Sequence, residues 1–192
     1  RQELLNAIYS GPFVTAAKQE FSNSNNANLQ KWQSYVKGDP KRQEILAVAL
    51  VWVAASKGDT ITGYLSKHRS DSSIAELKAY FTSVIDWVAS VFTRSPDAEM
   101  RGLDWGRLYE LYHGTSYSPS ALDARVDELR RDGAVKNPKG IYEYLLGGEK
   151  QTQLLDIRLF EESAKRRVAL GLARLEQRGG GQDDGADHHR LR

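Results

Sequence analysis

Apolar side chains at helical spacing between residues 74 and 91 constrain the fold of this chain more than any other feature of its sequence. The spacing follows a period of 3.6 residues over about five turns. It is carried by Ile74, Leu77, Phe81, Val84, Ile85, Val88 and Val91. An earlier segment, Ile45 to Ala55, is apolar nearly all round, which is typical of a helix in the middle of a core. Together the two segments predict a helical core.

Helix-start signals divide the rest of the first half into shorter helices. Pro12 suits the first turn of a helix, and Asn28 can cap a helix after a polar loop. Asp39-Pro40 is a further start signal. We expect the tryptophans on apolar helical faces to lie in the core, namely Trp32, Trp52 and Trp87. The sequence thus predicts a helical core domain over residues 1–100.

The second half has the order of a winged-helix module. Asp104 can cap a helix over residues 105–112, and Ser118-Pro119 opens a second helix. Ala134-Val135 and Ile141–Tyr144 can then pair as a β-hairpin across a loop of turn-forming residues. In a winged helix the second helix lies in the major groove of DNA. Alternatively, residues 141–146 form a helical turn that ends at Gly147.

Basic residues near this turn are the candidate DNA-binding residues. They are Arg130, Arg131, Lys136 and Lys139, with Arg166 on a later predicted helix. Such side chains would contact phosphates, which adds affinity but little sequence specificity. The second helix also carries carboxylates that phosphates repel, at Asp123, Asp127, Glu128 and Asp132. The residues alone therefore leave two interpretations open, a DNA contact or a structural turn.

Catalytic and metal-binding patterns are few. The chain has no cysteine, which excludes disulfides and thiolate chemistry and fits a reducing cytoplasm. We expect His113 to lie at a helix end and His68 in an exposed loop. Asp187 and His188 are weak metal candidates by composition, and adventitious binding is the favoured interpretation. We therefore predict no catalytic residue and no cofactor for this chain.

The longest apolar stretch is too short to cross a bilayer, so no membrane partner is expected.

Five stretches in one order resemble a known family. They are "QELLNAIYSGPF", "ITGYLSKHRSDSSIAELKAYFTSVIDWV", "MRGLDWGRLYELYH", "GIYEYLLGGE" and "LLDIRLFEESAKRRV", within residues 2–168. This order resembles the central and later parts of bacterial proteins with an amino-terminal ParB-like domain and a carboxy-terminal HNH nuclease, relatives of the GmrSD-type restriction enzymes. The resemblance implies defence against foreign DNA, and a nuclease domain that would need a divalent metal.

The chain departs from that family at both ends. The Asp-Gly-Gln-Gln-Arg motif of the ParB-like domain is absent, and no Cys-x-x-Cys turns follow "AKRRV". Asp187-His188 resembles the Asp-His that opens the HNH motif, but the strand and helix that should follow are missing. We therefore expect a fragment without a complete nuclease site.

The sequence predicts a mostly α chain, a helical bundle followed by a helix-turn-helix-like unit with a small β-hairpin. That unit spans residues 101–150. Residues 151–177 are expected to hold an extended segment from Leu154 to Phe160 and a helix from Glu161 to Gln177, and a disordered tail spans 178–192. The predicted function is that of a cytoplasmic helical spacer that contacts DNA between flanking ParB-like and HNH domains. The alternative is a protein-interaction module without DNA binding.

Overall fold

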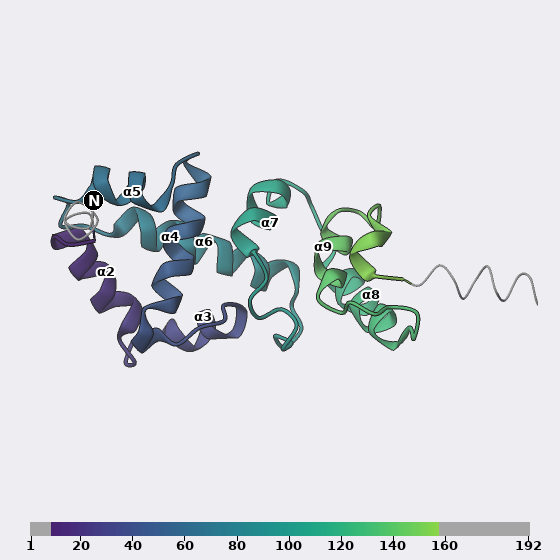
Figure 1. Cartoon of the computed structure of the whole chain (residues 1–192). Helices are drawn as coiled ribbons and strands as arrows, with labels where there is room; N and C mark the ends of the chain where they lie inside the picture. Colours follow the sequence, from purple (N-terminus) through teal and green to yellow (C-terminus); the bar gives the residue numbers. More distant parts are fainter. Residues whose placement is uncertain (1–8, 158–192) are drawn as a thin grey trace, which may run out of the picture. The chain divides into compact units, whose positions relative to one another are not determined.

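The computed structural model describes residues 9–157. Every secondary structure element among them is helical, which confirms the mostly α character of the predicted fold but not its helix-turn-helix-like unit with a β-hairpin (Figure 1). The helix predicted over residues 161–177, the predicted tail, Arg166, Asp187 and His188 lie outside the described residues. No single helix among the described residues is long and apolar enough to cross a bilayer, although α4 and α5, bent by 90°, pass as a pair on length and composition.

Helices α4 (Glu44–Ser56) and α6 (Ala75–Val91) form the centre of the first half. The predicted period of α6 is confirmed, because Leu77, Phe81, Val84, Ile85 and Val88 are all fully buried. Helix α4 packs against α6, α2 (Pro12–Ser22), α5 (Ile61–His68) and α7 (Trp105–Tyr112). These contacts bury most of its surface, as expected for an apolar helix.

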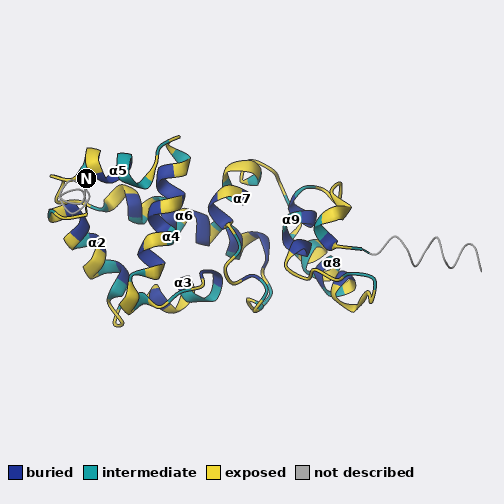
Figure 2. Cartoon of the chain, in the orientation of Figure 1, coloured by how far each residue is buried: buried dark blue, intermediate teal, exposed yellow. Residues whose placement is uncertain are grey.

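One face of α4 departs from the expectation of burial all round. Ala47, Val51 and Ala55, one turn apart, are exposed, and 46% of the Val51 surface is accessible. Figure 2 shows that α4 carries exposed as well as buried residues. The reason is that no element of the described chain covers this face. An apolar helix with one uncovered face therefore lies at the surface of the molecule.

Aromatic side chains connect α4 and α6 with α2 and α3. Helix α3 (Leu29–Tyr35) places Trp32 against Phe21 and Phe81, with ring centroids 5.0 and 5.3 Å apart. Trp52 stacks on Phe81 at 5.3 Å. The core positions of Trp32 and Trp52 are confirmed, whereas Trp87 is only half-buried and contacts Tyr109 at the edge of α7.

Most of the helix-start signals act as predicted. The Asp104 carboxylate accepts a hydrogen bond from the Arg107 amide at 3.3 Å and starts α7. Asp39-Pro40 begins a single 3₁₀ turn, η1 (Pro40–Arg42), in which the Asp39 side chain accepts from the Lys41 amide. Helix α3 begins after Asn28, but the Asn28 side chain makes no capping hydrogen bond.

The predicted β-hairpin is wrong. Residues 140–146 form helix α9 (Gly140–Leu146), the alternative that the sequence left open, and no strand occurs within residues 9–157. The Val135 amide donates to the Asp132 carbonyl and the Ile141 amide to the Pro138 carbonyl, and the amides of the predicted loop residues Lys136 and Asn137 donate to the Leu155 carbonyl. The physical reason is burial. As a helix, α9 buries its own apolar side chains on several of its faces, whereas an isolated two-stranded hairpin is at best marginally stable.

The carboxy-terminal part of the described chain packs on the core through separate helices. Helix α7 packs on α6 and α4, whereas α8 (Pro119–Arg131) packs on α9 and α6. A 3₁₀ turn, η2 (Thr152–Leu155), packs against α9, where an extended segment was expected from Leu154 onward. Because these packing contacts link all the helices in turn, residues 9–156 belong to one compact unit.

Candidate nucleic-acid interface

Arg130 is part of an ion-pair cluster centred on Asp97. Oδ2 of Asp97 lies 2.7 Å from Arg130 Nη1 and 3.2 Å from Arg94 Nε, and it accepts a hydrogen bond from the Tyr142 hydroxyl at 2.7 Å. Arg130 also reaches Glu99 at 3.3 Å. Because the loop before α7 supplies Asp97, α8 supplies Arg130 and α9 supplies Tyr142, the cluster joins three parts of the chain.

The charges of this cluster stabilise one another. Burial alone would raise the pKa of Asp97, but the hydrogen bonds from Tyr142 and Arg130, with the charge of Arg94, outweigh burial and hold that pKa below its ordinary value. The hydrogen bond to Asp97 raises the pKa of Arg130. Burial and the hydrogen bond to Asp97 raise the pKa of the Tyr142 hydroxyl. Arg130 is therefore committed to contacts within the protein, which argues against its predicted role at phosphates.

The remaining basic candidates lie together in sequence on an exposed segment, Arg131 to Lys139, called the basic segment below. Arg131 and Lys139 are exposed, and within the described chain their side chains have no hydrogen-bond or ion-pair partner. Lys136 is also exposed, and its Nζ donates to the Gly133 carbonyl at 2.6 Å. Two lysines and one arginine here are thus free of any carboxylate partner within the described residues.

The basic segment is held in place through its backbone. The Lys136 and Asn137 amides each donate to the Leu155 carbonyl at 3.1 Å, and Asn137 Nδ2 donates to the Leu154 carbonyl at 2.8 Å. Asp132 Oδ1 accepts from the Ala134 amide at 2.9 Å. These bonds fix a turn, not the wing of a winged helix, and they present the cations at its surface.

The carboxylates of α8 that should repel phosphates are mostly engaged by neighbours. Asp127 pairs with Arg94 at 2.8 Å, Glu128 pairs with Arg125 at 2.7 Å, and Asp123 accepts from the Thr93 hydroxyl at 2.7 Å. The arginines thus neutralise Asp127 and Glu128, which lowers the repulsion between these carboxylates and a phosphate. Within the described chain the Asp123 and Asp132 carboxylates accept hydrogen bonds only from neutral groups, and Asp132 is an exposed carboxylate within the basic segment itself.

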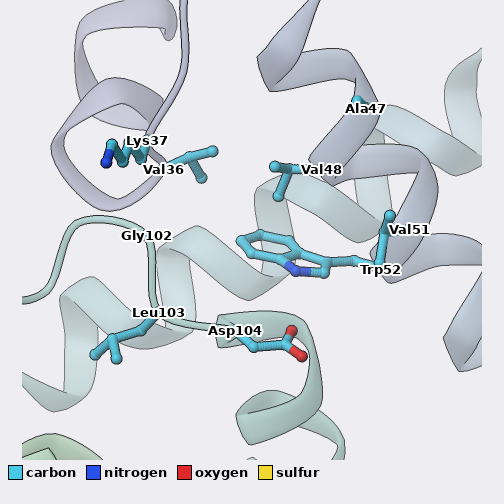
Figure 3. Close-up of a pocket in the computed structure, with 9 residues that line it drawn as sticks. All are labelled: Val36, Lys37, Ala47, Val48, Val51, Trp52, Gly102, Leu103 and Asp104. Atoms are coloured by element: carbon cyan, nitrogen blue, oxygen red, sulfur yellow. The ribbon is translucent and has the colours of Figure 1, made fainter. Parts of the chain in front are cut away.

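A second feature, which the sequence did not predict, is an apolar groove beside α4. Its main hollow, of about 350 Å³, lies between α4 and residues 102–104 and is lined by Val36, Val48, Trp52 and Leu103 (Figure 3). Lys37 lies at one end of this hollow and Asp104 at the other. The signal in the sequence was the unbroken apolarity of residues 45–55, which does not tell a covered face from an open one.

The two histidines of the described chain, His68 and His113, take structural positions. His113 follows the last residue of α7, and its Nδ1 lies 2.6 Å from the Tyr109 carbonyl, as expected for a helix end. His68 is the last residue of α5, not a loop residue; its Nδ1 lies 2.7 Å from Asp71 Oδ2 and its ring packs on Tyr64. Within residues 9–157 no group of three His, Asp or Glu side chains could hold a metal ion.

Comparison of the chain with protein-family models, with curated proteins and with solved structures finds no match. The resemblance to ParB-like and HNH proteins therefore stays a prediction.

Proposed function

We propose that this chain is the helical spacer of a restriction-type HNH endonuclease relative, and that it contacts DNA phosphates through the basic segment. The observation that supports the contact is the group of cations at Arg131, Lys136 and Lys139. None of them has a carboxylate partner in the described chain, whereas the neighbouring Arg125 and Arg130 are both paired. The five stretches in family order support the spacer role.

The contact is electrostatic and carries little sequence information. Lysine and arginine side chains that reach phosphates release condensed counterions, so binding weakens as salt rises. A turn fixed by backbone hydrogen bonds offers these cations without first having to be ordered. The segment therefore supplies affinity and position, while sequence recognition is left to other parts of the protein.

The test is fluorescence anisotropy of a labelled duplex of ~20 base pairs between about 50 and about 200 mM salt. Each lost phosphate contact removes about 0.9 from the slope of log K against log salt concentration. The triple variant Arg131→Ala/Lys136→Ala/Lys139→Ala should therefore bind more weakly, with a slope shallower by about two to three.

A matched control removes the same charge elsewhere. Lys18, Lys41 and Arg101 are exposed, and their side chains have no partner within residues 9–157. The variant Lys18→Ala/Lys41→Ala/Arg101→Ala should change the slope much less. Equal slopes for the two triple variants would show a contribution of net charge only, and would reject the basic segment as an interface. No binding by the unmodified chain at low salt would favour the structural alternative, a spacer without DNA contact.

A further inference from the structure

The outer face of α4 forms an apolar ridge. Ala47, Val51 and Ala55 lie one turn apart on this face, and all are exposed. Val51 protrudes most, since 46% of its surface is accessible. Apolar side chains on one helix face that no part of the described chain covers favour association over exposure to water.

A groove runs beside this ridge and follows it for its whole length. The main hollow lies next to Ala47, Val48, Val51 and Trp52. A second hollow of about 220 Å³ adjoins it at Val51 and Trp52 and continues to Ala55. The α4 surface thus presents a ridge and a groove side by side.

The groove carries opposite charges at its two ends. Lys37 lines the main hollow on the wall opposite α4, exposed and without a partner in the described chain (Figure 3). Asp104 and Glu110 line the second hollow together with Arg107, which lies 4.0 Å from Asp104 and 2.7 Å from Glu143. The carboxylates of this end outnumber its one arginine, so the first end is positive and the second end is negative.

We propose that this face binds a second copy of the same chain, with α4 packed against α4 of the partner around a twofold axis near Val51. In a twofold interface residue i of one copy meets residue j of the other, and j meets i. The ridge of each copy then enters the groove of the other, and Lys37 of each copy meets the Asp104 and Glu110 end of the other. A ridge, a groove and opposite end charges on one surface satisfy these requirements together.

The geometry of helix packing agrees with this arrangement. Residues four apart form the ridge used in the commonest class of helix contacts, in which the axes cross at about −50° and lie about 8–10 Å apart. The small side chains of Ala47 and Ala55 permit close approach on either side of Val51. The proposal does not depend on DNA binding, because the basic segment is not part of this face.

Sedimentation velocity of the full chain, without DNA, tests the proposal over a range of concentrations. The unmodified chain should show a monomer–dimer equilibrium, and Val51→Glu should remain monomeric because it buries a charge against its own copy. Tyr9→Glu is the matched control: Tyr9 is also 46% exposed but lines neither hollow. Far-UV circular dichroism should show the same helix content in all three. A monomer at every concentration of the unmodified chain overturns the proposal.

Charge reversal separates a twofold dimer from association with any other geometry. Lys37→Glu and Glu110→Lys should each weaken the dimer alone, since each places like charges at both ends of the interface. An equimolar mixture of the two variants should restore dimers, because each end then joins a Glu to a Lys. Dimers of either variant that match the unmodified chain, or a mixture that stays monomeric, would contradict this axis.

Cross-linking locates the axis directly. The chain has no cysteine, so Val51→Cys introduces a single thiol. A residue beside a twofold axis meets its own copy, and oxidation should yield a covalent dimer at micromolar protein. The Tyr9→Cys control should not cross-link at the same rate. Equal rates for the two variants would reject a twofold axis near Val51.

Discussion

Arg130 and Arg131 are neighbours in sequence with the same side chain, yet the fold gives them different surroundings. Arg130 is bonded to Asp97 and Glu99, whereas Arg131 is exposed and has no partner in the described chain. A charged group that loses its partners in a partly buried site costs free energy, while an exposed charge can be removed at little cost. The two residues therefore separate a structural role from a DNA-contacting role.

We expect Arg130→Ala to lower the free energy of unfolding by about 1–3 kcal/mol, because Asp97 and Glu99 lose a charge-assisted hydrogen-bond donor. Arg131→Ala should change it by less than about 0.5 kcal/mol. Urea unfolding of both variants checks this difference. Equal costs would show that the Asp97 cluster does not hold α8 to the loop before α7.

Acid should weaken the same cluster. The folded pKa of Asp97 lies below its ordinary value of about 3.8–3.9, so its carboxylate stabilises the folded state at neutral pH. That contribution is complete above the unfolded pKa and is lost as pH falls through the lower, folded pKa. Between neutral pH and about pH 2, Asp97→Asn should therefore lose less stability than the unmodified chain. A curve parallel to that of the unmodified chain would contradict this assignment.

At the scale of elements, the contact between α4 and α7 depends on a glycine. A Cβ added to Gly106 would lie 2.4 Å from Cγ of Trp52, a rigid buried ring, whereas one added to Gly114 would meet nothing within 4 Å. Only a residue without a side chain lets α7 approach α4 this closely. The position of α7, and with it one wall of the apolar groove, therefore depends on Gly106.

Gly106→Ala should cost about 1–3 kcal/mol through overpacking against Trp52. Gly114→Ala, the control, should be neutral or stabilise by up to about 1 kcal/mol, since its backbone conformation is open to alanine. Thermal unfolding with near-ultraviolet circular dichroism of the tryptophans reports both stability and the packing of Trp52. A stable Gly106→Ala variant with unchanged tryptophan signals would show that α7 can shift without cost.

At the scale of the whole molecule, the question is whether residues up to Asp156 unfold together. The predicted boundary near residue 100 implies two separate units. Contacts cross that boundary, however: Trp105 is fully buried and packs near Phe92 and Tyr142, and α8 is joined to Arg94 and Asp97. A shared core of this kind favours cooperative unfolding.

We expect amides of α6 and α9 to exchange through openings of the same free energy, measured by native-state hydrogen exchange at increasing denaturant. Circular dichroism and tryptophan fluorescence should also report one coincident transition. Exchange of α9 through a much smaller opening would instead support a separate unit after residue 100.

The sequence by itself determined most of the helices, but not α9, and several of the helix starts. A period of 3.6 residues marks α6, and side chains that bond to nearby backbone amides mark the start of α7 and of η1, because these are local effects. The complete burial of Trp105 does not follow from the residues near it in the sequence, because it depends on contacts with distant parts of the chain.

Only the tertiary structure decided which surfaces stay open. Residues 141–146 fit a strand or a helical turn in isolation, and burial against the rest of the fold selects the helix. The same holds for charge: Arg130 and Arg131 look alike in sequence, and partners distant along the chain make one of them structural. The apolar groove beside α4 is likewise a product of packing, because burial depends on what the fold brings to a face and not on the residues of that face alone.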